Sequence, residues 1–141
     1  MTDAKTWLSR GYWLRREREQ LERLREETMT RLTKTTATMS DAPGGGTKDP
    51  HKMDALATLD AELDSRLREL DKVKLEIFSA IQQLNDRRYR MVLLGRYYEC
   101  LEWGDIATLM HYEQRQVYRI HGMALTAIQP IIERRGSDGD V

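Results

Sequence analysis

The sequence has few of the residues that cross-link or interrupt a fold. Its 141 residues include one cysteine, Cys100, three prolines and one phenylalanine. A single cysteine excludes an intramolecular disulfide and is typical of a reducing cytosol. The N-terminal region lacks the apolar core of a signal peptide, and no apolar run approaches the length that spans a membrane. We therefore expect a soluble, cytoplasmic protein with no membrane partner.

Patterns of catalytic and metal-binding residues are also missing. His51, His111, His121 and Cys100 do not follow metal-ligand spacing. The stretch SDAPGGGTKDP has Gly-Thr-Lys where a phosphate-binding loop has Gly-Lys-Thr, and no predicted strand precedes it. The acidic residues lie among Arg and Lys on amphipathic segments, where a solvated helix face is the ordinary interpretation. The sequence thus predicts no enzyme, no metal site and no cofactor.

The net charge of zero conceals an uneven distribution along the chain. Residues 1–34 carry nine basic and six acidic residues, residues 35–84 carry six and nine, and residues 87–135 carry eight and five. The opposite charges of the first two segments suit pairing with each other. The third segment is mildly basic, so one copy alone would have only modest electrostatic affinity for nucleic acid.

What the sequence does contain is apolar residues at heptad spacing, which predicts two long helices. Residues 4–34 carry a narrow apolar seam between charged flanks, as in coiled coils. Its members are Trp7, Leu14, Leu21, Leu24 and Leu32. Residues 50–84 carry the strongest repeat in the chain. Its members are Leu56, Leu63, Leu70, Ile77 and Leu84.

The Gly-rich residues 40–49 separate these two helices. Three consecutive glycines cannot hold a helix, whereas Asp49 and Pro50 suit the N-cap and the first position of the next one. Folding back at this tip gives an antiparallel coiled-coil hairpin over residues 1–84, with the threonine-rich run Thr33–Thr38 fraying. Its seam can close within one chain or between chains. Because a two-helix hairpin buries little apolar surface, a homodimer or larger homo-oligomer through it would add stability.

A small module of helices is predicted over residues 85–135. Asn85 and Asp86 cap a helix that runs to about Cys100. Two further helices follow on either side of the polar break at His111 and Tyr112, and each has an apolar stripe at helical spacing. The stripes comprise Trp103, Ile106, Ala107 and Met110 in the first helix, and Val117, His121, Ala124 and Ile128, flanked by Ile120 and Leu125, in the second. Pro130 is expected to end or kink that helix, and residues 136–141 to be disordered.

Buried and exposed roles can be assigned to the ring residues of this module. Tyr97, Tyr98, Trp103 and Tyr112 have the spacing of a base-stacking platform, but core packing of a three-helix module is the more common role for such residues. His121 lies on the apolar side of its helix, where we expect it to be buried with a backbone hydrogen-bond partner.

The opposite side of the second helix is polar. It carries Gln114, Arg115, Gln116, Tyr118 and Arg119. A buried stripe fixes such a helix to its scaffold while the other side reaches base edges and phosphates of DNA. Arginine is suited to bidentate contact with guanine, and tyrosine to a phosphate or a thymine methyl group. The alternative is an ordinary solvated face.

The pattern over residues 101–128 resembles the helix-turn-helix in the fourth conserved region of bacterial housekeeping sigma factors. The matching residues are Trp103, Ile106, Ala107, Met110, Val117, Ile120, Ala124 and Leu125. Over nearly its whole length the chain is similar to a family of small phage-encoded proteins, which are of the same type as the ArpU and RinA late-gene transcriptional regulators. The resemblance implies binding of double-stranded DNA in a bacterial host cell, with Gln114, Arg115, Gln116 and Arg119 facing the major groove.

Two residues depart from the sigma-like pattern. His111 stands where the turn usually has glycine, so it must accept a strained backbone or shift the turn. Glu113 stands where the recognition helix usually begins with Ser or Thr. Its carboxylate suits the positive end of a helix, yet it would lie near DNA phosphates.

Other arginines are candidate phosphate contacts, with a solvated helix face as the alternative. They are Arg87, Arg88, Arg90, Arg96, Arg134 and Arg135.

The sequence therefore predicts an all-α, sequence-specific DNA-binding protein of phage or prophage type that regulates transcription, whose hairpin dimerises or docks RNA polymerase. The rival hypotheses are a DNA-packaging component similar to a small terminase subunit, and an interaction module that does not bind DNA. The DNA target and the direction of regulation are left open.

Overall fold

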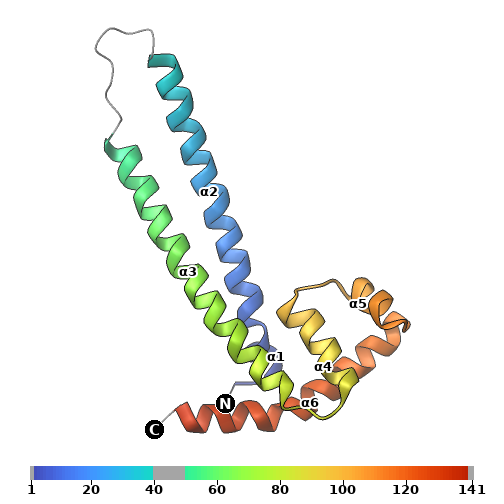
Figure 1. Ribbon diagram of the computed structural model, residues 1–141. Coiled ribbons are helices and arrows are strands. Elements are labelled where there is room, and N and C mark those ends of the chain that lie inside the picture. Colours follow the sequence, from blue (N-terminus) through green and yellow to red (C-terminus); the bar gives the residue numbers. More distant parts are fainter. Residues whose placement is uncertain (1, 40–49, 140–141) are drawn as a thin grey trace. The chain divides into compact units, whose positions relative to one another are not determined.

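The protein is built from helices alone in the part of the chain that the structure describes. That part of the computed structural model comprises residues 2–39 and 50–139 (Figure 1). The predicted all-α class is confirmed, because no strand occurs in these ranges. The elements are α1 (Ala4–Leu8), α2 (Arg10–Met39), α3 (Pro50–Gln82), α4 (Arg87–Leu93), the π-helix η1 (Leu94–Tyr98), α5 (Trp103–Met110) and α6 (Gln114–Gly139). The predicted Asp49 cap and Gly-rich tip fall outside the described residues.

Contacts divide the chain into two compact units. One comprises residues 14–69, and the other joins residues 1–13 to residues 70–141. The sequence had placed one boundary after residue 84. The structure places the division at residue 70, because from Leu70 to Leu84 the inward side chains of α3 and the turn after it are fully buried, whereas the preceding ones are only half-buried.

In the unit of residues 14–69, α2 and α3 of the same chain run side by side in opposite directions (Figure 1). Ion pairs within this unit join them: Arg66 lies 3.0 Å from Glu17, and Arg25 pairs with Asp60. As the residue number rises along α2 it falls along α3, as antiparallel pairing requires. Since exposed ion pairs each contribute only about 0–1 kcal/mol, these contacts select the alignment of the helices more than they stabilise it.

The seam of α2 differs from the one that the sequence predicts. Half-buried positions of α2 alternate at spacings of four and three residues: Leu14, Arg18, Leu21, Arg25, Thr28 and Leu32. Leu24, an expected seam residue, is 42% exposed. Arginine can occupy a seam because its methylene stem is buried while the guanidinium reaches solvent. No described side chain of residues 14–69 is fully buried as a result.

The predicted helix over residues 4–34 is interrupted at Ser9. The Ser9 hydroxyl donates a hydrogen bond to the Lys5 carbonyl at 2.6 Å, and the Ser9 amide donates to the same oxygen at 2.9 Å. The part before Ser9 is the short helix α1. Its N-cap is Asp3, whose carboxylate accepts a hydrogen bond from the Thr6 amide at 2.7 Å. After the interruption α2 continues to Met39, so the fraying expected from Thr33 onward is not observed.

The core of the second unit gathers α1, the end of α3, α4, η1, α5 and α6. Its fully buried side chains include Leu8, Ile77, Ile81, Val92, Leu93, Ile106, Val117, Ile120 and Ile128. The predicted cap at Asp86 is confirmed, with its carboxylate accepting from the Arg88 amide at 2.8 Å. The Ala4 amide donates to Gln129 Oε1 at 2.7 Å, so the chain's first helix is tied to its last.

The last helix does not end at Pro130, so the first of the two outcomes predicted for this proline is wrong. α6 runs through Pro130 to Gly139, which also carries it into the tail expected to be disordered; residues 140–141 lie outside the described range. An interior proline costs a helix about 3 kcal/mol. Burial of Ile131 and Ile132, which are 7% and 3% exposed, offsets this cost by about 1.5–3 kcal/mol for each side chain.

Burial separates two leucines that the sequence alone cannot rank. Leu8→Ala should lower the free energy of unfolding by about 2–5 kcal/mol, because it leaves a cavity in a core that admits no solvent to Leu8. Leu24→Ala should change it by about 0.5 kcal/mol or less. Urea denaturation of both variants measures the difference, and equal losses would contradict the observed seam.

Candidate nucleic-acid interface

The segment in which the sequence predicts a helix-turn-helix comprises α5, residues 111–113 and the start of α6. The turn depends on His111, whose backbone is left-handed with φ 58° and ψ 38°. The amides of His111 and Tyr112 donate back to the carbonyls of Thr108 and Ala107, at 3.2 and 3.0 Å. Of the two outcomes expected for histidine here, the structure shows the strained backbone.

The apolar sides of α5 and α6 face each other and α4. Ile106, Ala107, Val117 and Ile120 form a buried cluster with Val92. The stripe expected on α6 is therefore confirmed at its apolar members. Of the ring residues expected in the core, Trp103 and Tyr112 cover the edges of this cluster, together with Tyr89, and Tyr97 is buried. Tyr98 is only half-buried and lies beside Phe78, with 5.9 Å between ring centres. The first turns of α6 are thus packed on the side that carries Val117 and Ile120.

His121 is half-buried and its partner is a side chain, which corrects the predicted backbone partner. Its Nε2 lies 2.7 Å from the Tyr97 hydroxyl, and the two rings stack at 5.7 Å. Burial, together with the smaller effects of the Lys5 and Arg96 charges, lowers the pKa of His121 to about 4. Burial also raises the pKa of Tyr97 to about 12. Both rings are therefore uncharged at neutral pH, as a hydrogen bond inside an apolar cluster requires.

Trp103 joins the elements of this module. Its ring centre lies 4.6 Å from that of His121 and 5.1 Å from that of Tyr118, both edge to face. The guanidinium of Arg96 lies over the same ring at 4.5 Å and donates to the Leu101 carbonyl at 3.1 Å. One indole thereby contacts η1 and two successive turns of α6.

A π-helix supports this cluster and was not predicted. Within η1, Gly95 lies so close to α5 that an added Cβ would be 3.2 Å from Ile106 Cγ1. The element ends at Tyr98. Two residues later Cys100 has φ 59°, and the Leu101 amide donates back to the Gly95 carbonyl at 2.9 Å. The sequence offered a signal only in Gly95, an isolated glycine inside an otherwise helical pattern.

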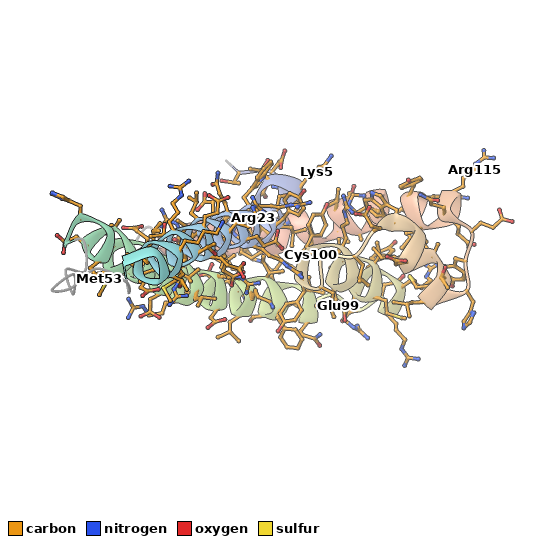
Figure 2. The ribbon with its side chains drawn as sticks, turned by 90° about the horizontal axis from the view of Figure 1, so that it is seen from above. Lys5, Arg23, Met53, Glu99, Cys100 and Arg115 are labelled. Carbon is orange, nitrogen blue, oxygen red and sulfur yellow. The ribbon has the colours of Figure 1, made fainter. Side chains whose placement is uncertain are left out.

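The five residues predicted to face DNA share the exposed side of α6. Gln114, Arg115, Gln116, Tyr118 and Arg119 are all exposed. In Figure 2 the Arg115 side chain extends away from the ribbon. Within the described residues the guanidinium groups of Arg115 and Arg119 have neither a hydrogen bond nor an ion pair, so both keep their full donor sets for a ligand. Gln114 differs, because its Nε2 donates to the Tyr118 hydroxyl at 2.7 Å.

Most of the arginines considered as phosphate contacts have partners within the fold. Arg88 lies 3.1 Å from Asp86, Arg90 donates to the Leu84 carbonyl at 2.6 Å, and Arg135 donates to Ser79 at 2.6 Å. Arg96, whose guanidinium lies over the Trp103 ring, is the fourth of the six candidates that has a partner within the fold. Arg87 and Arg134 are exposed and have no such partner among the described residues.

No group of three or more His, Cys, Asp or Glu side chains that could hold a metal ion occurs in the described ranges. None of the helices described there combines the length and the hydrophobicity needed to cross a lipid bilayer.

The left-handed turn gives a stability prediction. His111→Gly should raise the free energy of unfolding by about 1 kcal/mol, because glycine adopts this backbone without the steric cost that a Cβ imposes. His111→Ala is the control, since it removes the imidazole but keeps the Cβ and should give no gain. Thermal and urea denaturation compare the three proteins; an equal gain for alanine would show that the imidazole, not the backbone, is unfavourable.

The His121–Tyr97 pair gives a pH prediction. Because the pKa of His121 is about 4 in the fold against 6.5 in the unfolded chain, the unfolded state binds the proton more readily between these values. The contribution of His121 to the free energy of unfolding is therefore complete above pH 6.5 and is lost as the pH falls towards 4. The pKa values of Asp3 and Asp86 are also lowered, but from 3.8, so their contribution is lost only at lower pH.

His121→Gln, which keeps a polar group opposite Tyr97, should reduce the fall in unfolding free energy between pH 6.5 and 4.5. Urea denaturation across this range measures it. An unchanged pH dependence in the variant would contradict the assignment to His121.

Searches of protein-family models, of curated proteins and of solved structures find no match to this chain.

Proposed function

We propose that the protein binds double-stranded DNA in a sequence-specific manner, with the first turns of α6 in the major groove. The observation that carries the proposal is the division of α6 into two sides. Val117, Ile120 and Ala124 are at most 1% exposed, whereas Arg115 and Arg119 are exposed and unpaired in the described structure. A helix held firmly on one side and presenting cations and amides on the other can be inserted into a groove without unfolding its support.

The chemistry of the exposed side suits base edges. Arginine can donate two parallel hydrogen bonds to O6 and N7 of guanine, and each such contact is worth about 1–3 kcal/mol of discrimination. The acidic residue nearest to Arg115 in the sequence is Glu113, which is exposed. Its backbone carbonyl accepts hydrogen bonds from the amides of Gln116 and Val117, at 3.0 and 3.1 Å, and so lies at the start of α6. Its charge opposes phosphate binding at the start of the helix, so we assign contacts with base edges, and not with phosphates, to the residues that directly follow it.

We further propose that two copies act together through residues 14–69. The net charge of zero gives one copy little general attraction to DNA. No described side chain of that unit is fully buried, so pairing with a second hairpin would bury apolar surface that a single hairpin leaves half-exposed. Two modules per complex would also multiply weak contacts.

The sigma-like resemblance supports transcriptional regulation as the biological role, with RNA polymerase as the partner of the hairpin.

The proposal predicts the effect of removing the two unpaired cations. Selection of bound sequences from a random DNA pool, at stated salt concentration, should yield one preferred site, and a palindromic site would indicate a dimer. Arg115→Ala and Arg119→Ala should each weaken binding to that site by about tenfold or more. Arg68→Ala, which removes the same charge from an exposed position of α3, should have little effect.

Three outcomes would count against the proposal. Failure of the native protein to select any sequence would favour a module that binds another protein. Equal losses for Arg68 and for the α6 variants would indicate charge attraction without recognition. A large ring of subunits on the selected DNA would favour a packaging role over transcriptional regulation.

A further inference from the structure

The amide of Gln114 is held in one orientation before any ligand binds. Gln114 is the first residue of α6, and its Nε2 donates to the hydroxyl of Tyr118, one turn later, at 2.7 Å. Tyr118 is itself placed by an edge-to-face contact with Trp103, at 5.1 Å between ring centres and 65° between planes. A chain of two contacts therefore links the exposed amide to the aromatic cluster beneath it.

That cluster is not free to rearrange. Trp103 also contacts His121 at 4.6 Å and lies under the guanidinium of Arg96 at 4.5 Å. Since Arg96 donates in addition to the Leu101 carbonyl at 3.1 Å, both the ring and the cation over it are fixed. An exposed glutamine usually samples many rotamers and loses that freedom on binding, whereas this one has lost part of it already.

The hydrogen bond also decides what Gln114 can offer to a base. A glutamine amide has one carbonyl oxygen, which accepts, and two N–H groups, which donate. With one N–H given to Tyr118, one donor and one acceptor remain in the amide plane. Adenine presents the complementary pair in the major groove, N7 as acceptor and the N6 amino group as donor, whereas guanine presents two acceptors.

We infer that Gln114 reads an adenine in the major groove and that Tyr118 is the positioning residue that orients it. This inference rests on the proposed DNA binding and deepens it by naming the base. Tyr118 has a competing role, because its O–H can still donate to a phosphate. A phosphate contact would strengthen binding to all sequences equally, whereas positioning affects one base pair.

Tyr118→Phe separates these two roles, because it removes the hydroxyl and keeps the ring on Trp103. Binding is measured to the selected site and to three variants of it in which the adenine assigned to Gln114 is replaced by each other base. Gln114→Ala identifies that position. Gln20→Ala, a change of an exposed glutamine in α2, is the control for loss of an amide elsewhere. Thermal unfolding of every variant is recorded alongside.

The expected result is a loss confined to one position. Gln114→Ala should reduce the preference for adenine there by about tenfold or more. Tyr118→Phe should reduce the same preference while leaving preferences at other positions and the unfolding temperature unchanged. In the free protein, NMR of the Gln114 side-chain amide should show restricted motion that Tyr118→Phe releases.

Several results would overturn the inference. An unchanged preference in Tyr118→Phe, a preference at the Gln114 position for a base other than adenine, or an equal loss on all sequences would each do so while leaving DNA binding intact. An amide whose motion is the same with and without the Tyr118 hydroxyl would remove its structural basis without any DNA present. If the native protein selects no site, the inference and the proposed function fail together.

Discussion

The packing of one indole is the constraint on which the C-terminal module depends. Trp103 receives Arg96 on its face and the edges of Tyr118 and His121 around it, so η1, α5 and α6 share a single contact centre. Each aromatic pair contributes about 0.5–1.5 kcal/mol beyond its buried area. Their joint effect is geometric as much as energetic, because they fix the rotation of α6 about its axis and hence which residues face outward.

The parts of the fold that depend on local periodicity could be predicted from the sequence. The helical class, the cap at Asp86 and the stripe of Val117, Ala124 and Ile128 all follow from spacing and side-chain type. Non-local packing decided the rest. α6 passes Pro130 because burial of Ile131 and Ile132 offsets the cost of the proline. The break at Ser9 is the exception, because it accompanies a local hydrogen bond to Lys5 that the apolar periodicity does not reveal. Neither the Tyr97–His121 pair, 24 residues apart, nor the π-helix leaves a periodic signal.

The arginines show why composition alone overstates a nucleic-acid surface. Arg90 and Arg96 satisfy backbone carbonyls within the module, and Arg18 and Arg25 occupy the seam of α2 as apolar stems. A guanidinium with five donors is well suited to such positions, since it can satisfy several acceptors while its stem packs. Among the candidate arginines, those whose guanidinium groups have no partner in the described structure are exposed on the surface of their helices. Exposure relative to neighbouring elements, which only the fold supplies, therefore separates Arg115 and Arg119, together with Arg87 and Arg134, from the arginines that have partners within the fold.

The tie between the first and last helices has a mechanical consequence. The presented end of α6 begins at Gln114, whereas Ala4, Leu8 and Gln129 hold the helix some fifteen residues further on, which is roughly 22 Å along its axis. Val117 and Ile120 pack the first turns of the same helix into the core, so the two ends are mechanically connected. A tilt of about 5° about Gln129 displaces Gln114 by roughly 2 Å and shifts the packing of these turns with it. Substitutions in the first eight residues can therefore shift the exposed residues of α6 without contacting them.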